Sequence, residues 1–169
     1  EFLDALPIRQ YVMRTGKWHE RRIGFDGNFL FLLGEETIDA ELPDAEDGAI
    51  YEVSPQRAKV VAEMTTRIKE QGGALLMIDY GHCLGGVGET FQAVRNHLYT
   101  NVLENQGDAD LTSHIDFASL ALDILNQEIP VTLCCQKEFL EKMGISLRAE
   151  QLKKNATEKQ ASDIDKALH

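Results

Sequence analysis

Residues 73–82 read GALLMIDYGH, an apolar run that ends at an acidic and an aromatic residue. Residues 74–79 fit one strand, and their first five side chains are apolar without alternation, which indicates a strand covered on both faces of a parallel sheet. A run this short is also compatible with a helical segment, but the glycines on both sides favour the strand. Ligands of open α/β sheets bind beyond the carboxyl ends of such strands. Asp79, Tyr80 and His82 are therefore predicted at the mouth of a site; the simpler alternative is a core strand followed by a turn that Asp79 caps.

The residues before this run predict a helix that leads into the strand. Ser54 and Pro55 suit a helix start, because serine caps helices and proline is tolerated at the first helical position. Apolar residues then recur at helical spacing, and Gly72 and Gly73 are placed to end the helix. A helix, a glycine pair and a buried strand are typical of a doubly wound sheet.

Residues 10–50 predict a β-rich region followed by an acidic loop. Asp26 and Gly27 form a good hairpin signal between two of its strands. Trp18 is the only tryptophan and is expected to anchor packing. Residues 35–48 carry seven acids and are expected to be an exposed loop. The expected strands are residues 11–13, 17–23 and 28–33.

The second half of the chain predicts a loop, a strand and several helices. Residues 89–112 are polar and irregular and are expected to be one long loop. Asp116 suits the N-cap of a helix with one apolar face. Residues 129–136 are predicted as a second apolar strand that buries Cys134 and Cys135 as inert thiols. Further helices are expected at residues 138–143, at residues 147–153 and after a capping box of Thr157 and Gln160.

Composition limits the classes of function. The 169 residues carry a formal net charge of -11 and no basic run, which argues against a nucleic-acid partner. No apolar run approaches the roughly 18 residues of a membrane span. The three cysteines fit a reducing compartment, and without a Cys-x-x-Cys pair no metal site is predicted. The chain begins at Glu1 without a targeting segment and is expected to be cut from something longer.

Two short segments supply the candidate catalytic groups. Glu1 and Asp4 are three residues apart, so they can share one face of a helical turn, where two carboxylates could orient a cationic substrate or accept a proton. A frayed, solvated terminus is the alternative. Residues 108–117 contain two further candidates. His114 could act as a base or a ligand, or it could be a plain loop residue. Asp116 could be functional, or it could only cap a helix.

Six motifs together resemble one family. They are EFLDALP at 1–7, WHER at 18–21, IDYG at 78–81, TFQAVRNH at 90–97, GDADLTSHIDF at 107–117 and QKEFLEKMGI at 136–145. In this order they resemble the MidA-type methyltransferases, a family that includes the mitochondrial protein arginine methyltransferase needed for respiratory complex I assembly. The resemblance implies a class I enzyme that uses S-adenosylmethionine (SAM) and has a Rossmann-like sheet.

The resemblance also implies a domain organisation. Residues 1–169 would be one partial methyltransferase domain of the α/β class with an incomplete Rossmann-like class I sheet. Residues 10–50 would be an inserted β-hairpin region with an acidic loop, and residues 51–169 the C-terminal part of the core with accessory helices. The family's glycine-rich cofactor loop and ribose-binding acid have no counterpart in this sequence. The fragment alone is therefore expected to bind SAM poorly and to be inactive.

The resemblance assigns roles to particular residues. Glu1 and Asp4 would lie beside the methyl-transfer centre and hold a guanidinium, and Glu1 and Asp79 would contact the cofactor. The resemblance also implies a protein substrate. It places the protein in the cytoplasm of a bacterial host or in the mitochondrial matrix of a eukaryotic host. The expected catalytic residues are Glu1, Asp4, Tyr80, His114 and Asp116.

Two other functions remain open at this level. One is a non-catalytic protein-interaction module built on part of a methyltransferase fold. The other is a metal hydrolase that uses His82, His97 or His114 together with aspartates.

Overall fold

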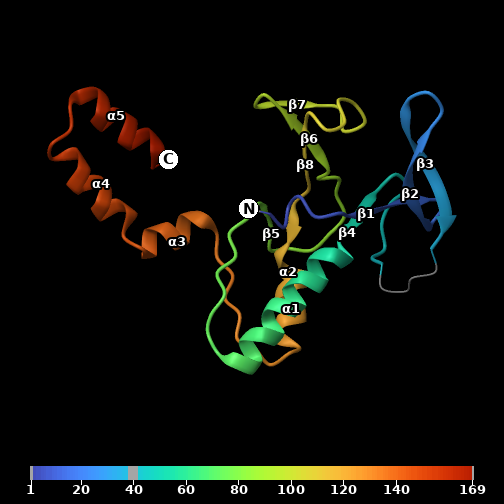
Figure 1. Cartoon of the computed structure of the whole chain (residues 1–169), viewed down its shortest axis with the longest axis horizontal. Coiled ribbons are helices and arrows are strands. Elements are labelled where there is room, and N and C mark those ends of the chain that lie inside the picture. The colour runs from blue at the N-terminus through green and yellow to red at the C-terminus, as the bar shows by residue number, and fades with distance from the viewer. Residues whose placement is uncertain (1, 38–41, 169) are drawn as a thin grey trace. The chain divides into compact units, whose positions relative to one another are not determined.

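The computed structural model describes residues 2–37 and 42–168 (Figure 1). It consists of two units, Glu1–Val131 and Thr132–His169. The predicted site residue Glu1 lies outside the described residues, as do residues 38–41 of the predicted acidic loop. No helix in the described ranges has both the length and the apolar character needed to cross a bilayer.

The first unit begins with an antiparallel sheet in the order β3-β2-β1-β4 (Figure 1). The predicted hairpin is confirmed, because β2 and β3 pair on either side of a turn at Asp26, where Gly27 has φ 102°. Glycine adopts this left-handed conformation without steric cost. The strands are β1 (Arg9–Arg14), β2 (Lys17–Phe25), β3 (Phe29–Glu36) and β4 (Ile50–Val53).

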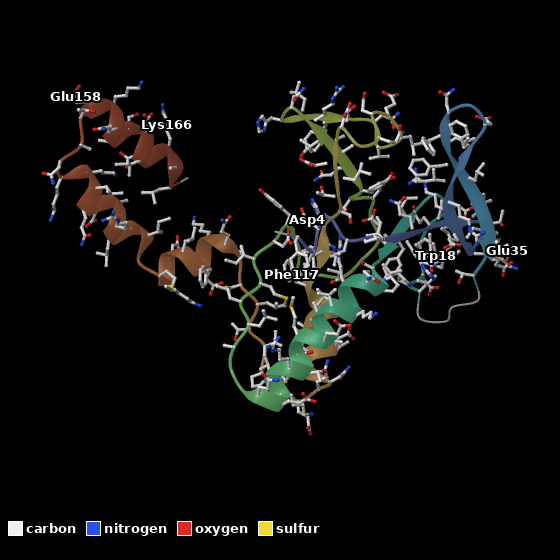
Figure 2. All side chains as sticks on the ribbon, in the orientation of Figure 1. Asp4, Trp18, Glu35, Phe117, Glu158 and Lys166 are labelled. Atoms are coloured by element: carbon white, nitrogen blue, oxygen red, sulfur yellow. The ribbon has the colours of Figure 1, made fainter. Side chains whose placement is uncertain are left out.

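Trp18 anchors a small core on this sheet, as predicted. The Trp18 side chain lies on the β-rich part of the chain (Figure 2). It is buried with Tyr11 and Met13, and the partly buried Leu42 and Ala45 pack against this cluster. The indole Nε1 donates a hydrogen bond of 2.8 Å to the carbonyl oxygen of Pro43. The indole therefore ties β2 to the segment that leads into β4, and its polar atom is satisfied.

Two helices enclose the main core of the first unit. Helix α1 (Pro55–Gln71) starts at Ser54, whose hydroxyl accepts a hydrogen bond from the Arg57 N–H, and it ends at Gly72. Helix α2 (Phe117–Leu125) is capped by Asp116, which accepts a hydrogen bond from the Ser119 N–H. Both caps were predicted from the sequence. The core between the helices consists of Leu3, Val61, Ile115, Leu120 and Ile124.

The prediction of a strand at residues 74–79 is wrong for this chain. Residues 72–79 form neither helix nor strand, and Leu76 and Ile78 are exposed while Met77 packs against the core. Among the described residues, the only parallel pairing is two residues long, between β5 (Gly81–His82) and β9 (Ile115–Asp116). Among the described residues, strand pairing in this region is limited to Gly81 and His82 of β5.

The predicted loop at residues 89–112 is also wrong in part. It contains an antiparallel sheet in the order β7-β6-β8, formed by β6 (Gln92–Arg95), β7 (Leu98–Thr100) and β8 (Asp110–Thr112). Asn96 and His97 turn the first hairpin with positive φ values of 51° and 64°. This conformation is typical of a two-residue hairpin turn, which asparagine tolerates well.

The predicted second apolar strand at residues 129–136 is absent as well. Residues 128–135 are irregular, although Ile129 and Val131 pack against the main core. Cys134 and Cys135 are exposed, so the prediction of buried thiols is wrong. The apolar residues of this segment are explained by the packing of Ile129 and Val131, two residues apart, and the segment does not pair with another strand in the described part of the chain.

The second unit is helical, as predicted. Gly144, with φ 87°, separates its first two helices, and the Thr157–Gln160 capping box starts the third. Lys153 and Asp165 form an ion pair between the last two helices. The helices are α3 (Gln136–Lys142), α4 (Ile145–Lys153) and α5 (Glu158–Ala167).

Replacing Thr157 with alanine is expected to loosen α5. The substitution removes the hydroxyl that accepts a hydrogen bond from the Gln160 N–H, which stabilises a helix start by about 1 kcal/mol. Amide hydrogen exchange in α5 should become faster by a corresponding factor. Ser162→Ala is the matched control, because Ser162 is exposed inside α5 and alanine favours helix there. Equal exchange rates in the two variants would contradict a stabilising cap.

Candidate functional site

One carboxylate holds the opening segment against the end of the 73–79 run. Asp79 Oδ2 accepts hydrogen bonds from the backbone N–H groups of Phe2, Leu3 and Asp4, at 3.3, 3.1 and 3.4 Å. Its Oδ1 accepts a hydrogen bond of 2.8 Å from the Tyr80 N–H. The structure thus brings together Asp4 and Asp79, which the sequence predicted at one site.

We call the contact between residues 2–4 and residues 79–80 the junction. A buried arginine that the sequence analysis missed also binds the opening segment at this junction. Arg57, 5% exposed, donates to the carbonyl oxygens of Leu3 and His114 at 2.7 Å each. It also donates to the carbonyl oxygens of Asp4 and Ser113 at 3.0 Å and to Ser113 Oγ at 2.6 Å. One side chain therefore joins the start of the chain to the segment before β9.

The charge of Arg57 is balanced by carboxylates. Burial lowers the pKa of Arg57, while the nearby charges of Glu52, Asp79 and Asp4 act in the opposite direction. A sequence signal was available, because Arg57 lies four residues before Val61 on the buried face of α1. A charged residue on an apolar helix face indicates a buried polar contact.

Two of the cavities on the first unit are lined by some of the predicted site residues. The first encloses about 460 Å³ and is lined by Tyr51, His82, His114, Asp116 and the glycine-rich residues 84–88, among others. The second encloses about 320 Å³ and has Asp4 in its wall. Tyr80 is 65% exposed and lines neither.

In the first cavity, a histidine faces a carboxylate. His82 Nδ1 lies 4.0 Å from Asp116 Oδ1 and is buried without a hydrogen-bond partner in the described part of the chain. The same Asp116 oxygen accepts a hydrogen bond of 3.0 Å from the Ser119 N–H. Burial, and after it the charge of Asp116, raises the pKa of Tyr51. The described residues contain no group of three or more His, Cys, Asp or Glu side chains that could hold a metal ion.

The second cavity combines a carboxylate with apolar and aromatic side chains. Asp4 shares its wall with Gln10 and Arg21 of the sheet and with Phe31 of β3 and Phe91. No group in the described ranges donates a hydrogen bond to the Asp4 carboxylate. A half-buried carboxylate is suited to bind a cation.

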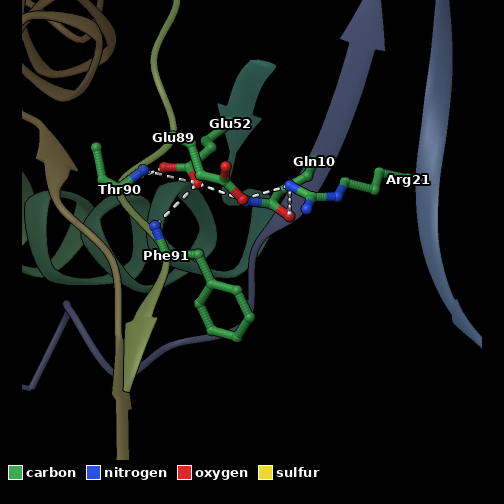
Figure 3. A network of polar contacts seen from close by, with 6 residues as sticks. All are labelled: Gln10, Arg21, Glu52, Glu89, Thr90 and Phe91. Atoms are coloured by element: carbon green, nitrogen blue, oxygen red, sulfur yellow. Dashed lines mark hydrogen bonds and ion pairs between the residues drawn. The ribbon is translucent and has the colours of Figure 1, made fainter. Parts of the chain in front are cut away.

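A polar network fixes the wall of the second cavity (Figure 3). Glu52 accepts hydrogen bonds from Gln10 Nε2 at 2.7 Å and from the N–H groups of Thr90 and Phe91 at 3.2 Å each. Arg21 pairs with Glu89 and donates to Gln10 Oε1 at 3.4 Å. The network joins β1, β2 and β4 to the start of β6 and so holds Arg21 and Phe91 in place.

A family model with the description "Putative S-adenosyl-L-methionine-dependent methyltransferase" matches residues 1–131. The chain belongs to this methyltransferase family. The match ends where the first unit ends, so the junction and both cavities lie inside it. The resemblance recognised from the six motifs is therefore confirmed.

Curated relatives carry the name protein arginine methyltransferase NDUFAF7. The mitochondrial homolog of Caenorhabditis elegans is 34% identical over 161 residues, which are 90% of this chain and 38% of the relative. The mitochondrial protein of Homo sapiens is 31% identical over 158 residues, which are 90% of this chain and 36% of the relative. The chain thus spans less than two fifths of the length of these methyltransferase-family relatives.

Solved structures confirm the fold. An uncharacterized protein from Burkholderia thailandensis superposes with a TM-score of 0.80 at 20% identity, covering 98% of this chain and 48% of the other. A second structure from that organism, bound to S-adenosyl-homocysteine, gives a TM-score of 0.75 at 20% identity and covers 98% and 46%. The predicted α/β class I methyltransferase fold is therefore correct, although the 74–79 strand is not formed in this chain.

Proposed function

We propose that this chain holds the methyl acceptor in a SAM-dependent methyltransferase that acts on arginine side chains of proteins. One observation carries the proposal: Asp79 fixes the turn at Phe2–Asp4, and Asp4 lines the wall of a cavity. The names of the curated relatives support arginine as the acceptor. Those names also support a mitochondrial location in a eukaryotic host.

The junction fits a cationic cofactor and a cationic acceptor. Asp4 and Asp79 bring two carboxylates to one turn, and the buried Arg57 can balance only one of them. The glycines of residues 84–88 do not fit a cofactor cradle, because their spacing is not Gly-x-Gly-x-x-Gly. In this proposal the chain supplies the acceptor side of the site, with Asp79 holding the turn and Tyr80 beside it.

When bound, SAM would supply the methyl group: its carbon–sulfur bond would be exchanged for a bond to the acceptor nitrogen, leaving S-adenosylhomocysteine, and the nitrogen would lose one proton to water. Asp4 would orient the guanidinium through charge-assisted hydrogen bonds. Alignment of this kind lowers the barrier because the reacting atoms no longer need to find each other. His114 and Asp116 shape the neighbouring cavity, and a role for Glu1 rests on the resemblance alone.

Methyl transfer by the longest native polypeptide that contains residues 1–169 tests this function. Labelled SAM and a cell lysate should yield methylarginine in protein, detected by mass spectrometry, and titration calorimetry should show SAM binding. Asp4→Asn is expected to lower the transfer rate about 100-fold, because it removes the charge that aligns the acceptor. Asp163→Asn, at an exposed position of α5, is the matched control. Normal SAM binding without any methylated protein would instead favour an interaction module.

A further inference from the structure

The β-rich region contributes directly to the second cavity. Arg21, Ile23 and Phe31 come from the β2–β3 hairpin, and they face a cavity whose other wall contains Asp4 and Phe91. The hairpin is therefore part of the wall that a ligand of this cavity would touch.

The cavity has the chemistry of a site for an apolar stem that ends in a cation. Phe31, Phe91 and Leu111 provide apolar surface, and the Asp4 carboxylate provides negative charge. Arg21 forms an ion pair with Glu89. The positive charge of Arg21 is therefore neutralised by Glu89 and leaves the negative charge of Asp4 available. An arginine side chain has this form, with a three-carbon stem and a planar guanidinium.

The molecule already holds one guanidinium on an aromatic ring of this wall. The Arg21 Cζ atom lies 3.5 Å from the centroid of the Phe31 ring. Cation–π contacts of this kind favour arginine over neutral side chains. The stacked Arg21 and the Glu52 network also fix the positions of the two phenylalanines, so the wall is formed before a ligand binds.

We infer that the 320 Å³ cavity is the recognition pocket for the acceptor arginine, with Asp4 binding the guanidinium and Phe31 and Phe91 selecting its stem. This inference rests on the proposed function and deepens it. The β2–β3 hairpin is then a specificity element of the enzyme, contributed by residues 10–50.

Binding of a short peptide in the absence of SAM tests the pocket without requiring turnover. The probes are acetyl-Gly-Arg-Gly-amide and the same peptide with citrulline, which keeps the shape of arginine but has no charge. Calorimetry is expected to show binding of the arginine peptide that is at least about tenfold tighter than that of the citrulline peptide. Asp4→Asn should abolish this preference while leaving the backbone hydrogen bonds of Asp4 in place.

Phe31→Leu tests the aromatic wall. It is expected to weaken binding of the arginine peptide about tenfold, because the aromatic surface that packs against the arginine stem is lost. Phe25→Leu is the matched control, since Phe25 is exposed on the same hairpin and lies outside the cavity. Circular dichroism and the unfolding midpoint of each variant show that the fold is retained.

The outcomes separate this inference from the proposed function. Absence of peptide binding, equal binding of both peptides, or equal effects of Phe31→Leu and Phe25→Leu would overturn the pocket assignment even if methyl transfer occurs. Selective arginine binding that depends on Asp4 and Phe31 would support the pocket even if no methyl transfer is found, and that combination would overturn only the proposed function.

Discussion

Replacing Arg57 with methionine is expected to lower the free energy of unfolding of the first unit by about 3 to 5 kcal/mol. The substitution keeps an apolar stem but removes five hydrogen bonds to the opening segment and to residues 113–114. The carbonyl oxygens of Ser113 and His114 would lose the Arg57 donor, and each unsatisfied group costs about 1 to 3 kcal/mol. Chemical denaturation followed by the fluorescence of Trp18, the single tryptophan, measures the change.

Two further variants separate the hydrogen bonds from the charge. Arg57→Lys keeps the charge but cannot span the same acceptors, so we expect an intermediate loss of stability. Arg67→Met changes an exposed arginine of the same helix and should have an effect within about 0.5 kcal/mol. If Arg57→Met proved no more destabilising than Arg67→Met, Arg57 would not hold the junction together.

Replacing Leu120 with alanine is expected to destabilise the first unit by about 2 to 5 kcal/mol. Leu120 is 6% exposed and packs in the cluster with Leu3, Val61 and Ile115, so truncation leaves a cavity between α1 and α2. The same denaturation experiment measures the loss of stability.

Leu122→Ala is the control for this cavity. Leu122 lies two residues further along α2 and is 60% exposed, so its truncation creates no internal space. We expect a change within about 0.5 kcal/mol for this variant. Similar losses for the two leucines would mean that α2 does not present Leu120 to the core.

Local signals in the sequence predicted the ends of the helices well. Ser54, Asp116 and Thr157 cap helices as expected, because a side-chain oxygen and the N–H two or three residues later form a contact within a single turn. The hairpin at Asp26 and Gly27 depends on an equally local conformation. Such features need no information about distant segments.

Pairing between distant segments could not be predicted in this way. The apolar run at residues 74–79 has the composition of a covered strand, but the described residues form no strand there. Conversely, β6 is weak as a sequence pattern and exists because β7 and β8 satisfy its backbone on both sides. Strand formation depends on the neighbour as much as on the segment itself.

The candidate site was predicted in part. The proximity of Asp4 and Asp79 followed from the resemblance, and their contact is backbone to side chain. The sequence did not reveal that Asp4 faces one cavity and that His114 and Asp116 line another. That division depends on where the hairpin wall at Phe31 lies, which no motif specifies.

The three exposed cysteines have a practical consequence. Cys83 belongs to the first unit, and Cys134 and Cys135 open the second. With Cys135→Ser, each unit would keep a single accessible thiol for a maleimide dye. Energy transfer between the two dyes would then measure the distance between the two labelled thiols in solution, with and without a peptide or cofactor.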